Sequence, residues 1–167
     1  LHHALRADVE DRLAEVSREF VDVAVVTPFA QVWPGFAATV VPEADVLDLA
    51  PASHDLIVHA LCLHWADDPV GQLVQCRRAL RPDGLFIGAL FGGQTLHELR
   101  SALATHEVAV TGGLSPRVLP MGEIRDLGSL LGRAGFAMPV ADSVATKVLY
   151  RDSAALLQDL RVMGEGN

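Results

Sequence analysis

The stretch Asp55–Gly93, DLIVHALCLHWADDPVGQLVQCRRALRPDGLFIGALFGG, decides the fold of this chain. It contains two short, mostly apolar runs, Asp55–Leu63, which His59 interrupts, and Leu85–Phe91, which includes Gly88. Each has the length of a strand that is buried on both faces. Between them, residues 69–80 have apolar side chains at helical spacing, and the sequence RPDG at 81–84 is typical of a turn that ends a helix. A strand, a helix and a strand in this order predict a right-handed crossover between parallel strands.

The rest of the chain predicts further helices and strands around this unit. In chain order they are an amphipathic helix over 1–20, a strand over 22–27, a short helix over 29–36, a strand over 38–41, helices over 94–110 and 121–133, an edge strand over 139–150, and a helix over 152–161. Thr95 and Asp152 are the expected N-caps of two of these helices. The pattern predicts one α/β domain over residues 1–167, with three layers and strands 23–26, 56–61 and 85–90 as parallel neighbours.

Composition and charge exclude several classes of function. Half of the 167 residues are hydrophobic and a fifth are charged, which is typical of a globular domain. The net charge is -8 and the longest basic run is Arg77-Arg78, which argues against nucleic acid as the main ligand. No apolar run approaches the roughly 18 residues of a membrane-spanning helix, and no signal peptide opens the chain.

Cysteine and histidine usage points to a reduced compartment and no metal. Cys62 and Cys76 fall inside a predicted strand and helix, so we interpret them as buried thiols and expect a cytoplasmic protein. His2 and His3 are adjacent on a helix and point about 100° apart, so they do not form a metal site. Because the chain begins with Leu1 rather than Met, we expect the sequence to be incomplete at both ends.

Three strings carry a resemblance to a known family. They are LHWADDPVGQLVQCRRALRPDGLF, FGGQTLHELR and GGLSPRVLPMGEIRDLGSLLGRAGF. Together they resemble the class I methyltransferases that use S-adenosylmethionine, and most closely the malonyl-carrier-protein methyltransferases of biotin synthesis and their relatives among mitochondrial complex I assembly factors. The resemblance covers roughly Asp55–Asn167. It implies a Rossmann-like methyltransferase fold, S-adenosylmethionine as cofactor, and a small molecule or a carrier-bound acid as methyl acceptor.

The sequence departs from this family after the first predicted strand. The resemblance implies an acidic residue and a glycine-rich turn there, whose backbone N–H groups cradle the cofactor. The chain instead reads Val26-Thr27-Pro28-Phe29-Ala30-Gln31. Pro28 has no N–H to donate, and the Phe29 ring needs the space of the ligand. The segment 28–54 is also too short for two strand–helix units, so we expect a sheet that is shortened by about one unit and weak or absent cofactor binding.

Site residues follow from the resemblance, position by position. It implies that Glu43, Asp45 and Val46 lie near the adenine of the cofactor, with Leu61 beside the cofactor at the end of the next strand. On the substrate side it implies His64, Trp65 and Arg117, with Arg117 as a contact for an anion. No catalytic side chain can be named, because methyl transfer from an activated sulfonium mainly requires alignment.

Three functions are compatible with these residues. The first is methyl transfer to a small molecule or a carrier-bound acid. The second is that of a pseudo-enzyme, which keeps the fold and binds a protein partner, for example in respiratory-complex assembly. The third, implied by the assembly-factor branch alone, is hydroxylation of a protein arginine.

Since a shortened sheet leaves part of a face uncovered, we also expect Val32, Trp33, Phe36 and Val40 to be poorly buried and to form a homodimer or a protein contact.

Overall fold

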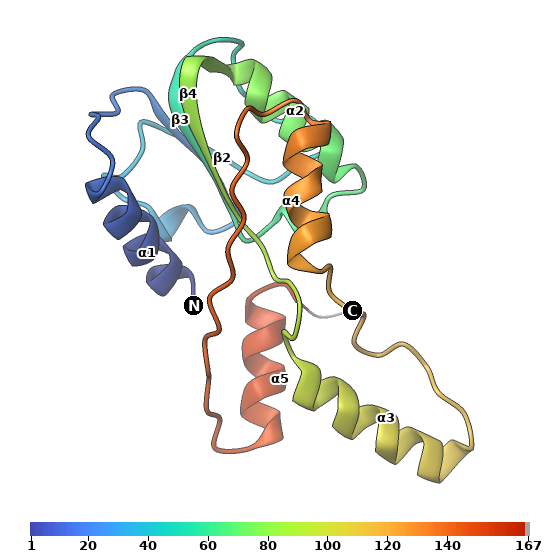
Figure 1. Ribbon diagram of the computed structural model, residues 1–167. Helices are drawn as coiled ribbons and strands as arrows, with labels where there is room; N and C mark the ends of the chain where they lie inside the picture. The colour runs from blue at the N-terminus through green and yellow to red at the C-terminus, as the bar shows by residue number, and fades with distance from the viewer. Residues whose placement is uncertain (166–167) are drawn as a thin grey trace.

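The computed structural model describes residues 1–165 and shows a parallel sheet between two layers of helices (Figure 1). Its four strands are β1 (Val23–Val26), β2 (Thr39–Val41), β3 (His54–Ala60) and β4 (Leu80–Ala89). They lie in the order β2-β1-β3-β4, and every neighbouring pair is parallel. The three-layer α/β fold and its parallel neighbours are therefore confirmed.

The helices are α1 (His2–Ala14), α2 (Pro69–Ala79), α3 (His97–Thr111), α4 (Ile124–Arg133) and α5 (Ser153–Val162), with 3-10 turns η1 (Ala30–Val32) and η2 (Leu63–Trp65). Helix α1 covers one face of the sheet and α2 covers the other. On one face Val9 of α1 packs with Val32, Trp33 and the strands. On the other face α2 packs against the sheet, and Leu130 and Leu131 of α4 pack against α2. All seven residues of β3 are consequently buried.

The crossover from β3 through α2 to β4 forms as the sequence predicts. Asp68 caps α2 by accepting a hydrogen bond from the Gly71 N–H at 2.8 Å, and Pro69 occupies the first turn. The helix ends at Ala79, but β4 already begins at Leu80 rather than at Leu85. His54 pairs with Leu80 and Leu56 pairs with Leu85, so residues 81–84 loop out of the strand.

Several predicted boundaries are wrong. The first helix ends at Ala14 instead of residue 20, and the helix predicted from Met121 begins at Ile124. Thr95 does not cap α3, because its hydroxyl donates to the Gly92 carbonyl at 2.8 Å and the helix begins two residues later, at His97. Asp152 does cap α5, accepting from the Ala155 N–H at 2.8 Å.

The predicted edge strand over 139–150 is absent. The segment is extended and mostly exposed, without strand assignment. An alternating pattern supplies the side chains of a strand, but a strand also needs a neighbour for its backbone N–H and C=O groups. No other part of residues 1–165 pairs with it. The sequence pattern was therefore not sufficient to form the element.

The expected uncovered face is also wrong for two of its residues. Val32 and Trp33 are only 5% and 1% exposed, because α1 covers them. Phe36 is half-buried against the same cluster, and Val40 on the edge strand β2 is exposed. The sheet is short on this side, since only η1 connects β1 to β2, but its own chain closes the face. Among the described helices, none has both the length and the apolar character needed to cross a membrane.

Candidate functional site

The carboxyl ends of the parallel strands meet at one edge of the sheet. In open α/β sheets ligands bind along this edge, where the chain leaves neighbouring strands. The segments that leave β1, β2, β3 and β4 here are 27–29, 42–47, 61–65 and 90–93. All of the predicted site residues except Arg117 lie on these segments.

The turn after β1 is closed by bonds within the chain. The Thr27 N–H donates to the Val41 carbonyl at 2.9 Å, and the Phe29 N–H donates to the Thr27 hydroxyl at 3.1 Å. Pro28 between them has no N–H. The Phe29 ring is half-buried and lies 4.2 Å from the His2 ring, measured between centroids. Three consecutive residues thus offer no free backbone donor, so this turn does not fit the methionine end of S-adenosylmethionine.

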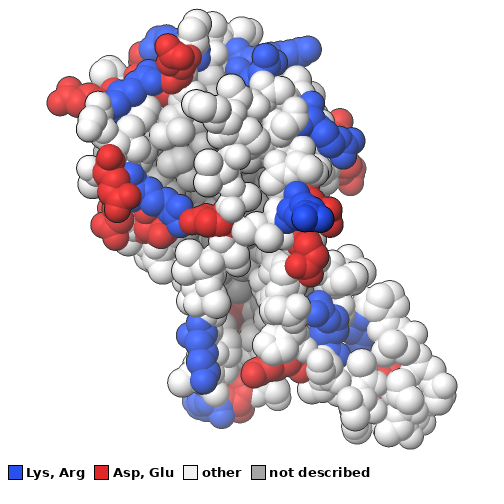
Figure 2. Space-filling view, in the orientation of Figure 1, with Lys and Arg blue, Asp and Glu red and all other residues white. Residues whose placement is uncertain are grey.

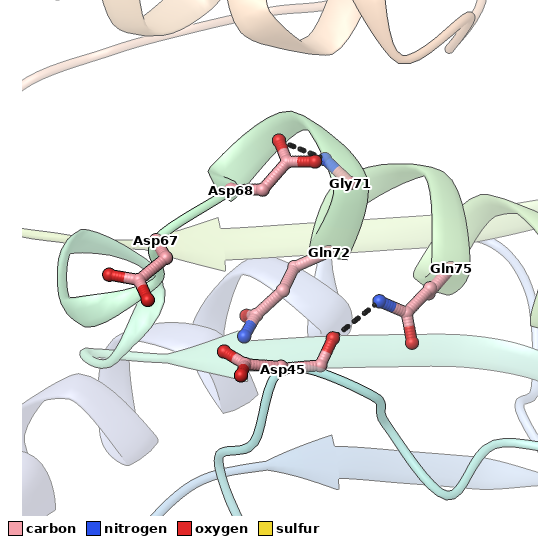
Figure 3. A pocket seen from close by; sticks show the side chains of 6 residues that line it. All are labelled: Asp45, Asp67, Asp68, Gly71, Gln72 and Gln75. Carbon is pink, nitrogen blue, oxygen red and sulfur yellow. Dashed lines mark hydrogen bonds between the residues drawn. The ribbon is translucent and has the colours of Figure 1, made fainter.

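The acidic loop after β2 is fixed by two glutamines of α2. Gln72 Nε2 donates to the Ala44 carbonyl at 2.8 Å, and Gln75 Nε2 donates to the Asp45 carbonyl at 2.8 Å. The Gln75 side chain also accepts from the Leu47 N–H at 2.8 Å. A cavity of about 140 Å³ lies here, and the residues that line it are Asp45, Asp67, Asp68, Gly71, Gln72 and Gln75 (Figure 3).

The predicted adenine contacts occupy different positions in this loop. Asp45 lines the cavity, Glu43 is half-buried, and Val46 is exposed. Leu61, predicted beside the cofactor, is buried and donates its N–H to the Ala89 carbonyl at 2.9 Å. Its φ of 54° is in the left-handed region, which is unusual for leucine. The loop and Leu61 therefore lie at the edge, but they do not enclose one continuous pocket.

A buried polar chain lies beneath this loop. Gln72 uses its amide nitrogen on Ala44, so its oxygen must accept from His59 Nε2 at 2.9 Å. His59 Nδ1 is then an acceptor and lies 3.5 Å from Cys62 Sγ. Burial lowers the pKa of His59 to about 4 despite the hydrogen bond to Gln72, and burial raises the pKa of the Cys62 thiol to about 12. Both groups are neutral near pH 7, which suits a structural role.

His64 and Trp65 lie in η2, directly after β3. The His64 ring packs edge-on against Trp65 and Phe91, with centroid distances of 5.6 and 5.1 Å. His64 Nε2 lies 2.9 Å from Glu165 Oε1, beyond the end of α5. The two predicted substrate-side residues are thus adjacent, and the end of α5 contacts them.

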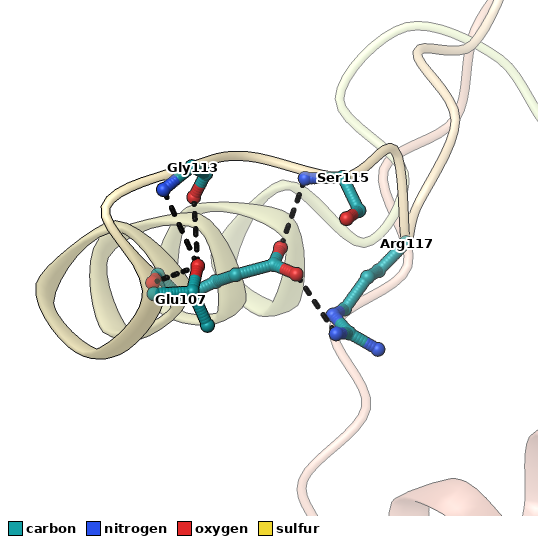
Figure 4. Close-up of polar contacts among 5 residues, drawn as sticks. Glu107, Gly113, Ser115 and Arg117 are labelled. Atoms are coloured by element: carbon teal, nitrogen blue, oxygen red, sulfur yellow. Dashed lines mark hydrogen bonds and ion pairs between the residues drawn. The ribbon is translucent and has the colours of Figure 1, made fainter.

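Arg117 lies elsewhere, in the loop that follows α3. Figure 4 shows that its guanidinium points at Glu107 of α3, with Nη2 2.8 Å from Oε1, while the Ser115 N–H donates to Oε2 at 3.1 Å. The hydrogen bond from Arg117, supported by that from Ser115, lowers the pKa of Glu107. Figure 1 shows α3 and this loop as a lobe that extends away from the sheet.

A second cavity of about 240 Å³ lies under this loop. It is lined by Arg100, Leu103, Ala104, Leu114, Ser115, Pro116, Arg117 and Val118. Arg100 Nη1 is buried and has no hydrogen-bond partner within residues 1–165. The cavity therefore combines apolar walls with one paired and one incompletely paired guanidinium, which suits a short acyl group that carries a negative charge.

The described residues contain no group of three or more His, Cys, Asp and Glu side chains placed to hold a metal ion. In the view of Figure 2, acidic and basic side chains are interspersed and form no continuous basic patch.

Several residues that shape the candidate site were missed by sequence reasoning. Gln72 and Gln75 are polar residues three apart on α2, and this spacing is the one signal that could have suggested a common target. Glu107 pairs with a residue ten positions away across a loop, and Glu165 pairs with a residue 101 positions away. Neither pairing follows from local periodicity.

Comparisons with known proteins agree on one family. A family model described as a methyltransferase domain matches residues 8–88. The chain is 43% identical over 129 residues to human "Arginine-hydroxylase NDUFAF5, mitochondrial", which covers 77% of this chain and 37% of the relative. It is 36% identical over 135 residues to the "Malonyl-[acyl-carrier protein] O-methyltransferase" of Xylella fastidiosa, covering 81% of this chain and 44% of that protein. The chain thus spans less than half the length of these two relatives.

Two solved structures share the fold at low sequence identity. One is a putative methyltransferase of Haloferax volcanii in complex with the Trm112 activator, with a TM-score of 0.56, 15% identity, and coverage of 96% of this chain and 90% of that chain. The other is a possible histamine N-methyltransferase of Thermotoga maritima, with a TM-score of 0.52, 16% identity, and coverage of 79% and 70%. At this identity they support the fold alone.

Proposed function

Because this chain belongs to the class I S-adenosylmethionine-dependent methyltransferase family, we propose that it uses the family's sheet to bind an acid-bearing substrate or a protein partner, and that it holds the cofactor weakly or not at all. The observation that carries this proposal is the turn after β1. Thr27 and Phe29 direct their N–H groups to their own chain, and Pro28 has none. The cavity beside the acidic loop, of about 140 Å³, is also smaller than the ~300 Å³ at which pockets for cofactor-sized ligands begin.

The expected loss of affinity is large. A bidentate contact to the ribose and one or two backbone hydrogen bonds contribute together roughly 3 to 5 kcal/mol. Each 1.4 kcal/mol is about a tenfold change, so a micromolar site becomes millimolar or weaker.

The substrate proposed for the retained scaffold is a small or carrier-bound carboxylic acid. The cavity with Arg100 and Arg117 supports this choice, because apolar walls accommodate an acyl chain while guanidinium groups bind a carboxylate. The name of the Xylella relative, a malonyl-carrier-protein methyltransferase, agrees with it. A protein partner or a homodimer is proposed as the alternative ligand of the same scaffold, since Val140, Val144 and Leu149 expose apolar side chains that another chain could cover.

Methyl transfer is the second candidate function. It is favoured by the loop 43–47, which α2 holds at the cofactor edge, and by His64 and Trp65 at the end of β3. Arginine hydroxylation, the activity in the name of the human relative, is the third. Mass spectrometry separates them, because a methylated acceptor gains about 14 Da and a hydroxylated arginine about 16 Da.

Isothermal titration of the folded protein with S-adenosylmethionine and its demethylated product tests the proposal. We expect no saturable binding up to about 1 mM. The Phe29→Gly variant removes the obstructing ring and serves as a comparison, and we expect it to remain weak because Pro28 still lacks a donor. Saturation near micromolar in the unchanged protein would refute the proposal and make methyl transfer the better assignment.

The cellular compartment is likewise a proposal. Two neutral, buried cysteines suit the reduced cytoplasmic setting that the sequence predicts. The names of the human, mouse and rat relatives place those proteins in mitochondria. Fractionation of cells with an antibody to this chain decides between the two.

A further inference from the structure

Residues 139–165, which we term the arm, follow α4 and include α5, and the extended part of the arm passes in front of the sheet in the view of Figure 1. The extended part, 139–150, is mostly exposed, and α5 buries only Leu160. An ion pair between Asp142 and Arg12, at 2.9 Å, joins the arm to α1, but both side chains are well exposed and such pairs contribute little. The arm therefore depends strongly on the contact made by its last turn.

That contact is buried and specific. Glu165 Oε1 lies 2.9 Å from His64 Nε2, and the two side chains are only 15% and 16% exposed. Gly164 precedes it with a φ of +80°, and a Cβ built on this residue would lie 3.0 Å from the Trp65 ring. The turn reaches His64 in this way because position 164 is glycine.

The position of this contact suggests a ligand subsite. His64 follows β3 at the carboxyl edge of the sheet, where parallel sheets bind ligands, and the Trp65 and Phe91 rings flank its imidazole. Its second nitrogen, Nδ1, is buried and finds no partner in the described part of the chain. An imidazole between two aromatic rings can bind the carboxylate of an acidic ligand. In this structure the carboxylate on the His64 ring is that of Glu165.

We propose that the arm is a movable strap, and that Glu165 occupies a carboxylate subsite on His64 which an acidic ligand takes when the strap opens. The inference rests on His64 and Trp65 as substrate-side residues, the assignment that supports the second candidate function. It adds that the chain blocks its own site, so that ligand binding and strap closure exclude each other.

Nuclear magnetic resonance of the two indole N–H groups tests the strap directly. The chain has two tryptophans, and a Trp33→Phe variant assigns the remaining signal to Trp65. Glu165→Gln removes the blocking charge, and Gly164→Ala breaks the turn without changing any charge. Glu123→Gln is the matched control, because Glu123 is exposed and its side chain makes no capping bond to α4. Malonate is the probe, and malonamide is its uncharged counterpart.

We expect both strap variants to shift the Trp65 signal and to bind malonate about tenfold more tightly than the unchanged protein, the factor that corresponds to a lost hydrogen bond to a carboxylate. Glu123→Gln should match the unchanged protein, and malonamide should bind none of them. Equal malonate affinity in all variants, or no malonate binding by any, would overturn the strap. Since cofactor is absent from this titration, a failure here is distinct from a failure of the cofactor titration.

Discussion

The burial of His59 makes the stability of the protein depend on pH between about 4 and 6.5. Its folded pKa is lowered to about 4 by desolvation, against 6.5 for the unfolded chain. The unfolded state therefore binds the extra proton between these values, and the free energy of unfolding decreases as the pH falls from about 6.5 towards 4. The slope is at most about 1.4 kcal/mol per pH unit for this one group.

We predict a measurable loss of stability between pH 6.5 and pH 5, by urea unfolding followed by circular dichroism. His59→Gln removes the titrating group, so it should be less stable at pH 7 but should show a flatter dependence on pH. His3→Gln, at an exposed position of α1, is the control and should keep the full dependence. An unchanged slope in His59→Gln would mean that another group is responsible.

At the scale of elements, the loop after β2 has no regular structure of its own and is placed by α2. Gln75 makes two of its bonds, to the Asp45 carbonyl and from the Leu47 N–H. We predict that Gln75→Ala lowers the free energy of unfolding by about 1 to 2 kcal/mol, since it leaves the Leu47 N–H without a partner. The Leu47 amide should also exchange with solvent faster, which hydrogen exchange measures residue by residue.

Gln158→Ala is the matched control for this prediction, because Gln158 is exposed on α5 and appears in none of the side-chain hydrogen bonds that fix the loop. Protection of the Leu47 amide that survives in Gln75→Ala would show that the loop is held by burial of the Leu47 side chain instead.

Which elements the sequence could predict depends on where their partners lie. The run 55–63 is mostly apolar because both faces of β3 are covered, and the consecutive residues Asp68 and Pro69 mark the start of α2. These signals are local, and they were confirmed. The strand over 139–150 and the cap at Thr95 were wrong, because the first requires a neighbouring strand and the second depends on where the chain leaves β4.

The candidate site shows the same limit. The Thr27-Pro28-Phe29 turn could be recognised from the sequence, since proline and a bulky ring stand where glycines are needed, and the structure closes this turn with the chain's own bonds. Arg117 was expected at an anion, and its nearest charged partner is Glu107 of its own lobe. Whether it also contacts a ligand stays a prediction. The link between Glu165 and His64 spans 101 positions and needed the fold.

At the scale of the whole molecule, we expect association with another chain through the extended segment 138–149, because the face around Trp33 is covered by α1. Exposed apolar side chains gather there, and they are Met138, Val140, Val144, Val148 and Leu149. Val144 is 69% exposed and Leu149 is 81% exposed. A strand-like segment with free backbone groups and apolar side chains is a typical site for pairing with another chain.

We predict that the protein associates with itself through this segment, and that its weight-average mass in sedimentation equilibrium rises between about 10 and 200 µM. The double variant Val144→Lys, Leu149→Lys should remain a monomer over this range, because it removes apolar area and adds like charges to both copies.

Ala141→Lys with Ser143→Lys is the matched control: it adds the same charge to the same segment but removes little apolar area, so association should be weakened less. If the control abolishes association as completely as the test variant does, charge repulsion explains the result and the apolar contact is not needed. A mass that stays at one chain for the unchanged protein would leave these exposed side chains to a different partner and would contradict the prediction.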